Sequence, residues 1–187
     1  MPRKPRLQLA GGFFHVFGRG VRREPIFWDD EDRQYFLNLL GVITDRQRWL
    51  VLAYCLMTNH FHLLLETPEP NLSTGMHRQL GGYAQWFNER HRVEGHVFER
   101  RYQSVLAESD AHMLELTRYV VLNPVRAGVC SHAGQYRWSS YRATAGLAPA
   151  PRFLAHERVL DFFRGPGGPP EMHYARFVTA DPARLIV

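Results

Sequence analysis

The chain has 187 residues, of which 45% are hydrophobic and 22% are charged. This length and composition indicate one globular domain with a full core, and exclude a disordered chain or two large domains. The net charge is +5, and Lys4 is the only lysine, so arginine carries almost all the positive charge. Arginine presents a planar fork of donors that suits phosphate oxygens, which points to nucleic acid as a partner. A solvated basic face is the alternative.

The cysteines and the hydropathy pattern narrow the class of protein further. Cys55 and Cys130 are far apart and belong to no CxxC pair, so neither a structural zinc site nor a disulfide framework is indicated. No apolar run reaches membrane-spanning length, and no secretory apolar core follows the basic N-terminus. We therefore expect a cytoplasmic, nucleoid-associated protein with no membrane partner.

The predicted elements alternate between strands and helices. In chain order we expect a strand at 12–18, a helix capped by Asp29-Asp30, strands at 49–56 and 60–66 around a turn at Thr58-Asn59, a helix from Ser73, a strand region at 95–106 and a helix capped by Ser109 or Asp110. This order predicts an α+β fold of the ferredoxin-like split βαβ type (β-α-β-β-α-β), with an antiparallel sheet and one further helix.

The composition of the chain changes after residue 142. An Ala/Pro-rich stretch runs to Pro151, a short helical segment follows, and the Gly/Pro-rich residues 165–170 read as a turn or linker. Residues 174–177 and 185–187 are apolar enough to dock on the core or to stay loose. We expect residues 143–187 to form a C-terminal extension that is partly helical or loosely docked.

Two pairs of polar residues carry the candidate chemistry. His60 and His62 project from one face of a strand, because side chains alternate along a strand. Tyr119 and Asn123 project from one face of a helix, because they are four residues apart. If the helix packs on the strand, a metal-binding histidine pair, a third polar ligand and a nucleophilic hydroxyl converge. Such a set suits metal-assisted phosphodiester chemistry.

Each of these residues also has a purely structural interpretation. The two histidines fit a half-buried pair that bonds to neighbours, and Tyr119 fits core packing. Asn123 precedes Pro124, which disfavours continued helix, so it fits a helix terminator. The joint occurrence of all four in this order favours the site.

Four segments carry a resemblance to a known family. Residues 53–65 (AYCLMTNHFHLLL) resemble the histidine–hydrophobe–histidine signature of the single-strand tyrosine (HUH-type) transposases, and residues 118–128 (RYVVLNPVRAG) resemble their tyrosine helix. Residues 95–102 and 136–141 also resemble segments of the branch called REP-associated tyrosine transposases, within the IS200-like family. The resemblance runs from about Phe14 to Tyr141. Thr58 stands where such proteins often carry proline.

The resemblance implies an activity and a set of roles. It implies that residues 1–142 form a transposase catalytic domain, which nicks single-stranded DNA beside a hairpin and leaves a 5′-phosphotyrosine and a free 3′-hydroxyl. Tyr119 is then the catalytic nucleophile, and His60, His62 and Asn123 hold Mg²⁺ or Mn²⁺. No nucleotide cofactor is needed, because the covalent link conserves the phosphodiester energy. Relatives of this kind include both monomers and homodimers.

Further residues are weaker candidates. Glu115 lies one helical turn before Tyr119 and could relay a proton or contact the metal shell, with surface solvation as the alternative. His15 could lie near the site or pack in the core. Trp138 could stack on a base or anchor the tail. The candidate DNA contacts are Arg6, Arg19, Arg22, Arg23, Arg118, Arg126, Arg137 and Trp138.

Two other functions remain open on the sequence. One is a domesticated DNA-hairpin-binding module that keeps the fold without turnover. The other is a phosphodiester hydrolase that uses the histidine-bound metal to activate water, which would make Tyr119 dispensable.

Overall fold

The computed structural model describes residues 9–180. The strands are β1 (Gly12–Arg19), β2 (Leu50–Met57), β3 (His60–Thr67) and β4 (Gln103–Leu106). The helices are α1 (Asp30–Gln47), α2 (Leu72–His91), α3 (Asp110–Arg126), α4 (Tyr141–Thr144), α5 (His156–Leu160) and α6 (Pro170–Thr179). Short 3₁₀ turns are η1 (Val21–Arg23), η2 (Ala133–Gln135) and η3 (Asp161–Phe163).

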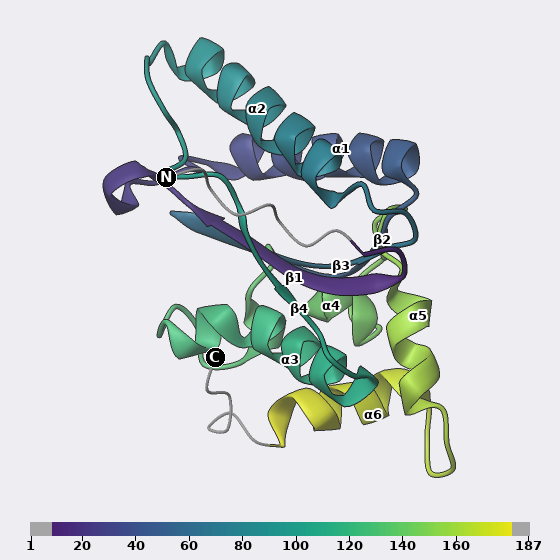
Figure 1. Cartoon of the computed structure of the whole chain (residues 1–187). Coiled ribbons are helices and arrows are strands. Elements are labelled where there is room, and N and C mark those ends of the chain that lie inside the picture. Colours follow the sequence, from purple (N-terminus) through teal and green to yellow (C-terminus); the bar gives the residue numbers. More distant parts are fainter. Residues whose placement is uncertain (1–8, 181–187) are drawn as a thin grey trace.

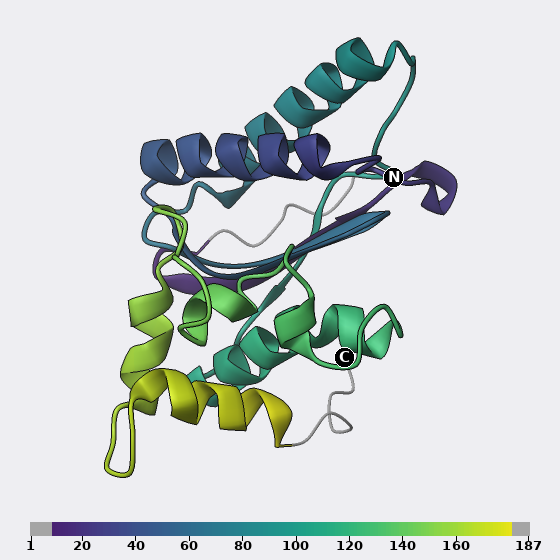
Figure 2. The same ribbon diagram turned by 180° about the vertical axis from the view of Figure 1, so that it is seen from behind.

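The four strands form one antiparallel sheet in the order β2-β3-β1-β4. Helices α1 and α2 cover one face of this sheet, and α3 to α6 cover the other (Figures 1 and 2). The element order and the antiparallel sheet confirm the predicted α+β fold with its split βαβ plan. The additional helix α3 lies against β2 and β3 on the face opposite α1 and α2.

The sheet lies between two hydrophobic cores, and strand β3 contributes side chains to both. Phe61, Leu63 and Leu65 are fully buried in the core beneath α1 and α2. Leu64 is buried in the other core, with the helices of the α3 side. Because side chains alternate along a strand, His60 and His62 share the face that looks towards α3.

The turn between β2 and β3 is tied to the segment that follows β1. The carbonyl of Thr58 accepts from the amides of Ile26 and Phe27, and the carbonyl of Asn59 accepts from the amide of Gly20. A Cβ at Gly20 would lie 2.2 Å from the carbonyl oxygen of Glu24, so the close approach of these backbones requires glycine. The turn at the entrance to β3 is therefore held by backbone contacts and not only by its own geometry.

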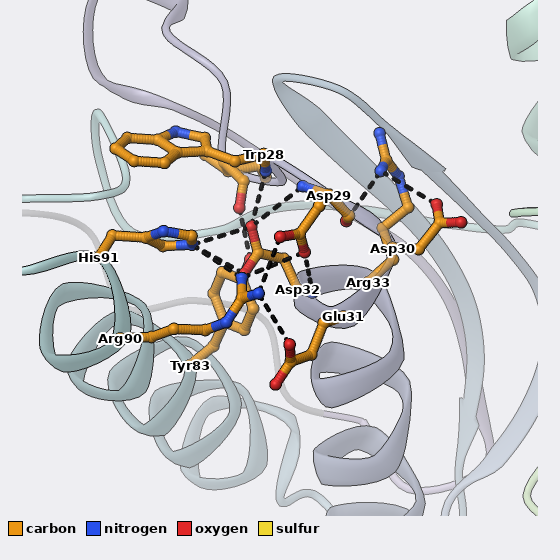
Figure 3. A network of polar contacts seen from close by, with 10 residues as sticks. Trp28, Asp29, Asp30, Glu31, Asp32, Arg33, Tyr83, Arg90 and His91 are labelled. Carbon is orange, nitrogen blue, oxygen red and sulfur yellow. Dashed lines mark hydrogen bonds and ion pairs between the residues drawn. The ribbon is translucent and has the colours of Figure 1, made fainter.

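A polar network joins the first turn of α1 to the last turn of α2 (Figure 3). Asp29 caps α1 by accepting from the Asp32 amide, and the fully buried Asp32 carboxylate accepts in return from the amides of Trp28 and Asp29. The same carboxylate bonds to Arg90 and to Nε2 of His91. We call these residues the Asp32 network; it fixes the two helices against each other above the sheet.

The C-terminal residues up to residue 180 pack onto the α3 side of the sheet. Val159, Leu160, Tyr174 and Val178 are buried in the same cluster as residues of α3. Residues 181–187, and with them the apolar segment 185–187, lie outside the described part of the chain. The division of the chain at residue 142 stays a prediction.

One expectation from the sequence needs correction, and one alternative interpretation is wrong. Only residues 103–106 of the segment 95–106 form a strand, and the earlier part contributes a single bridge between Gly20 and Phe98. Helix α3 does not end at Asn123 but continues through Pro124 to Arg126. Separately, none of the helices between residues 9 and 180 has the combined length and apolar character needed to cross a bilayer.

Candidate active site

Strand β3 and helix α3 bring the four candidate residues together. His60, His62, Tyr119 and Asn123 all line one cavity of about 420 Å³, which we call the His–Tyr cavity. The Tyr119 ring stands edge-on to the His62 ring, with centroids 5.7 Å apart. The His60 and His62 rings are perpendicular, with centroids 5.2 Å apart. The convergence expected from the sequence is therefore present in the fold.

The side chain of Asn59 determines which nitrogen of His60 is free. Nδ2 of Asn59 donates to the carbonyl of Arg23 at 2.9 Å, which orients the amide and turns its Oδ1 towards His60. That oxygen lies 2.7 Å from Nδ1 of His60 and can only accept, so Nδ1 carries the hydrogen. In the neutral ring, Nε2 of His60 then keeps its lone pair.

A third histidine holds His62. Nε2 of His15, on β1, lies 2.9 Å from Nδ1 of His62, and the two rings stack with centroids 5.1 Å apart. His15 is 1% exposed, and its ring also meets the edge of Tyr119. Within residues 9–180, its Nδ1 has no hydrogen-bond partner. His15 is both a packed core residue and a direct neighbour of the site.

Burial keeps these histidines neutral. Loss of hydration lowers the pKa of His60 to about 4, with a smaller contribution from the positive charge of Arg19. Burial, and secondarily the charge of His112, lowers the pKa of His15 to about 4. Burial also places the pKa of His62 well below its ordinary value. Neutral imidazoles are the form that binds a metal ion, so no proton has to leave at neutral pH.

Asn123 lines the same cavity. Its Nδ2 donates to the carbonyl of Tyr119 at 2.9 Å and to that of Val120 at 3.4 Å, which leaves Oδ1 as the unused acceptor. Two imidazole nitrogens and one amide oxygen form a donor set that fits Mn²⁺, and fits Mg²⁺ less well because Mg²⁺ prefers oxygen. No three His, Cys, Asp or Glu side chains gather as a metal site within residues 9–180. Asn123 is the third candidate ligand that lies with the histidine pair in the cavity.

Arginines surround the cavity. The guanidinium of Arg126 lies over the ring of Tyr119, with Cζ 4.9 Å from the ring centroid. Arg19 and Arg23, two of the candidate DNA contacts, line the cavity, and Arg100 and Arg101 line it as well. The last two were not singled out from the sequence, although residues 95–102 belong to one of the segments that carry the family resemblance.

Other predicted contacts lie away from the cavity or outside the described residues. Arg118 is 7% exposed, pairs with Glu115 and packs on the ring of Phe177. Neither Arg118 nor Glu115 is among the residues that line the cavity. Arg22 is exposed in η1, beside Arg23. Arg6 lies outside residues 9–180.

Trp138 and Arg137 are both bonded to α1. The indole nitrogen of Trp138 donates to Oδ1 of Asp30 at 3.0 Å, and Arg137 pairs with the other oxygen of that carboxylate at 3.1 Å. Trp138 is 9% exposed, so little of its ring is open for stacking. This placement favours the anchoring role of Trp138 over the stacking role.

Comparison with known proteins identifies the family. The family described as "Transposase IS200 like" matches residues 13–123, which is more than half of the chain. A protein of Haemophilus influenzae named "Putative REP-associated tyrosine transposase" is 28% identical over 101 residues, a match that spans 48% of this chain and 57% of that relative.

The fold is also similar to a solved structure of a REP-associated tyrosine transposase bound to a REP hairpin. The two superpose with a TM-score of 0.66 at 14% identity, over 83% of this chain and 92% of the other. At this identity the likeness concerns the fold. Together with the matched residues 13–123, which include the histidine pair, the tyrosine and the asparagine, it leads to one conclusion: the chain belongs to the IS200-like transposase family, with REP-associated tyrosine transposases among its relatives.

Proposed function

We propose that the protein is a metal-dependent single-stranded DNA endonuclease and strand transferase, a transposase that cleaves hairpin-associated DNA through a 5′-phosphotyrosine intermediate. The observation that carries the proposal is the shared cavity of Tyr119 with His60 and His62. The related fold solved with a REP hairpin supports hairpin DNA as the partner class. Tyr119 is the nucleophile, and the active unit is a monomer or a homodimer.

His60, His62 and Asn123 hold the metal ion in this proposal. The histidines offer Nε2, because Nδ1 of each is engaged by Asn59 or His15, and Asn123 offers Oδ1. With Nε2 of His62 used as a ligand, its Nδ1–H donates to His15, which keeps the ring in one tautomer. A bound Mg²⁺ or Mn²⁺ would polarise the scissile phosphate and offset the charge that develops on it.

The covalent step exchanges one phosphodiester bond for another. The Tyr119 oxygen attacks the phosphorus, the bond from phosphorus to the 3′-oxygen breaks, and the phenolic proton is lost while the 3′-oxygen gains one. Arg126 lies over the Tyr119 ring and favours the phenolate as its charge develops. A second 3′-hydroxyl can reverse the exchange, so strand transfer needs no nucleotide cofactor.

Arginines at the cavity wall supply the phosphate contacts. Arg19, Arg23, Arg100 and Arg101 line the cavity and form hydrogen bonds with phosphate oxygens of the strand that enters it. Each neutralised phosphate releases counterions, so binding weakens steeply as the salt concentration rises.

The test is a denaturing gel with a labelled hairpin oligonucleotide that carries single-stranded flanks. In Mg²⁺ or Mn²⁺ we expect a protein–DNA adduct that disappears in Tyr119→Phe and in His60→Ala. Tyr35→Phe is the matched control, because Tyr35 stacks on Trp86 away from the cavity and should leave the adduct unchanged. Cleavage that survives Tyr119→Phe would instead support the water-activating hydrolase. Binding with neither cleavage nor adduct would support the domesticated module.

A further inference from the structure

A second cavity lies between α2 and the segment that leads from α2 towards β4. Its volume is about 360 Å³, within the range of about 300–1,000 Å³ typical of small-ligand sites. We call it the α2 pocket. Its apolar wall comprises Met76, Leu80, Ala84 and Phe98. Four basic or imidazole side chains at its edge are exposed: His77, His96, Arg100 and Arg101.

Gly81 lines the α2 pocket and puts no side chain into it. A Cβ at this position would meet nothing within 4 Å, and the residue is exposed on the pocket side of α2. Gly75 in the same helix differs, since a Cβ there would lie 2.2 Å from the Trp49 ring, so packing requires that glycine. Glycine inside a helix is unfavourable relative to alanine, and no packing contact of residues 9–180 requires it at position 81. Its lack of a side chain instead leaves the pocket empty of protein.

The α2 pocket adjoins the His–Tyr cavity. Arg100 and Arg101 line both of them, so two consecutive cations form the wall that the two spaces share. The half-buried ring of Phe98 is held in place by Phe61 and Tyr83, each with ring centroids 6.1 Å away. A ligand that passes from one space to the other meets positive charge at the crossing and an apolar, aromatic wall beyond it.

We propose that the α2 pocket binds one unpaired nucleobase of the single-stranded DNA whose backbone runs past Arg100 and Arg101 into the His–Tyr cavity. The apolar wall and the Phe98 ring suit the flat face of a base, and the imidazoles of His77 and His96 can donate to or accept from its edge. None of the described residues that line the pocket is acidic, which suits a polyanion. The proposal rests on the proposed function in so far as that function places single-stranded DNA in the neighbouring cavity.

The experiment fills the pocket without disturbing the fold. Gly81→Leu projects a side chain into the open space, and Gly81→Ala is the matched control that leaves most of the space free. Both replacements favour a helix more than glycine does, so thermal melting should show stability equal to or above that of the original chain. Binding of the flanked hairpin oligonucleotide is measured by fluorescence anisotropy in EDTA, which prevents cleavage.

Each nucleotide of the single-stranded flanks is replaced in turn by an abasic site. We expect one position at which the abasic oligonucleotide binds the original chain and Gly81→Ala about tenfold more weakly, as for loss of one stacked base. Gly81→Leu should bind the intact oligonucleotide about tenfold more weakly and show no further loss at that position. Equal binding by Gly81→Leu and the original chain, or a flank in which no abasic position matters, would overturn the proposal.

Two comparisons separate this proposal from the proposed function. A hairpin without flanks should bind Gly81→Leu and the original chain equally; a loss there would show that the pocket does not take a base of the single-stranded flanks. The protein could form no Tyr119 adduct and still show one flank position whose abasic replacement weakens binding to the original chain but not to Gly81→Leu. That result would support the pocket and contradict the proposed cleavage. If the adduct forms but no flank position behaves in this way, the proposed cleavage is supported and the pocket proposal is overturned.

Discussion

Nε2 of His15 lies 2.9 Å from Nδ1 of His62, and the two rings stack on each other. Together with the bond from His60 to Asn59, this contact engages Nδ1 of both histidines of the pair. Each ring therefore turns Nε2, and not Nδ1, towards the cavity it shares with Tyr119. Outer partners of this kind fix the tautomer and the direction of a ligand ring.

The first prediction concerns His15 and metal affinity. His15→Phe keeps the ring packing and removes the acceptor for His62, so we expect the affinity for Mn²⁺ to fall about tenfold or more. Isothermal titration calorimetry without DNA measures this directly. His15→Gln restores an acceptor at a comparable reach and should recover part of the loss. Unchanged Mn²⁺ binding in His15→Phe would mean that His15 only fills space.

The second prediction concerns Arg126 and the reactivity of Tyr119. The guanidinium over the Tyr119 ring favours the phenolate, so Arg126→Ala should slow adduct formation about tenfold while the fold stays intact. Single-turnover kinetics with saturating DNA separates this effect from weaker binding. Arg22→Ala is the control, since Arg22 is exposed in η1 and does not line the cavity. Equal rates in the two variants would contradict the assigned role.

The third prediction concerns pH. The folded pKa of His15 is about 4, below its ordinary value of 6.5, so the unfolded chain binds more protons as the pH falls between these values. The contribution of neutral His15 to the free energy of unfolding is complete above pH 6.5 and is lost as the pH falls towards 4. From His15 alone we expect the free energy of unfolding to drop by about 2 kcal/mol between pH 7 and pH 5.

Urea denaturation at the two pH values in EDTA measures that drop. Carboxylates also titrate in this range, so the informative quantity is the difference between the original chain and His15→Phe. The variant should lose less stability on acidification. Parallel losses in both proteins would show that His15 is not held neutral in the folded state.

The fourth prediction concerns the Asp32 network. Asp32→Ala removes a fully buried carboxylate that accepts from the amides of Trp28 and Asp29 and bonds to Arg90 and His91, so we expect a loss of about 3 kcal/mol in the free energy of unfolding. Glu31→Ala removes an exposed partner of the same arginine and should cost less than about 1 kcal/mol. Chemical denaturation of both variants checks the contrast, and similar losses would contradict it.

The fold was largely predictable because its elements carry strong local signals. The Asp29 cap, the strands on both sides of Thr58-Asn59 and the Ser109 cap all lie within a residue or two of the expected places. The segment 95–102 was wrongly read as a strand, because apolar residues of an irregular loop that packs under α2 look like those of a strand. Helix α3 continues through Pro124 because tertiary packing outweighs the local preference.

The site was predictable in part. The spacing of His60 with His62, and of Tyr119 with Asn123, was enough to place each pair on one face. The contact that orients the His62 ring does not follow from this spacing, since His15 meets His62 only through the pairing of β1 with β3. In the same way, the inward position of Arg118 depends on α6, which lies far along the chain. Such contacts depend on tertiary structure and leave no local pattern.

The alternation of side chains along β3 links the packing of the hydrophobic core to the direction of the histidine rings. Phe61 and Leu63 face α1 and α2, and His62 between them faces Tyr119. A register slip of one residue would move the polar histidines into the apolar core beneath α1 and α2, and would move the phenylalanine and leucine out of that core, at a cost in free energy. The direction of the proposed metal ligands is thus set by the same apolar side chains that drive folding. A substitution that shifts these apolar side chains should therefore also turn the histidine rings that line the cavity.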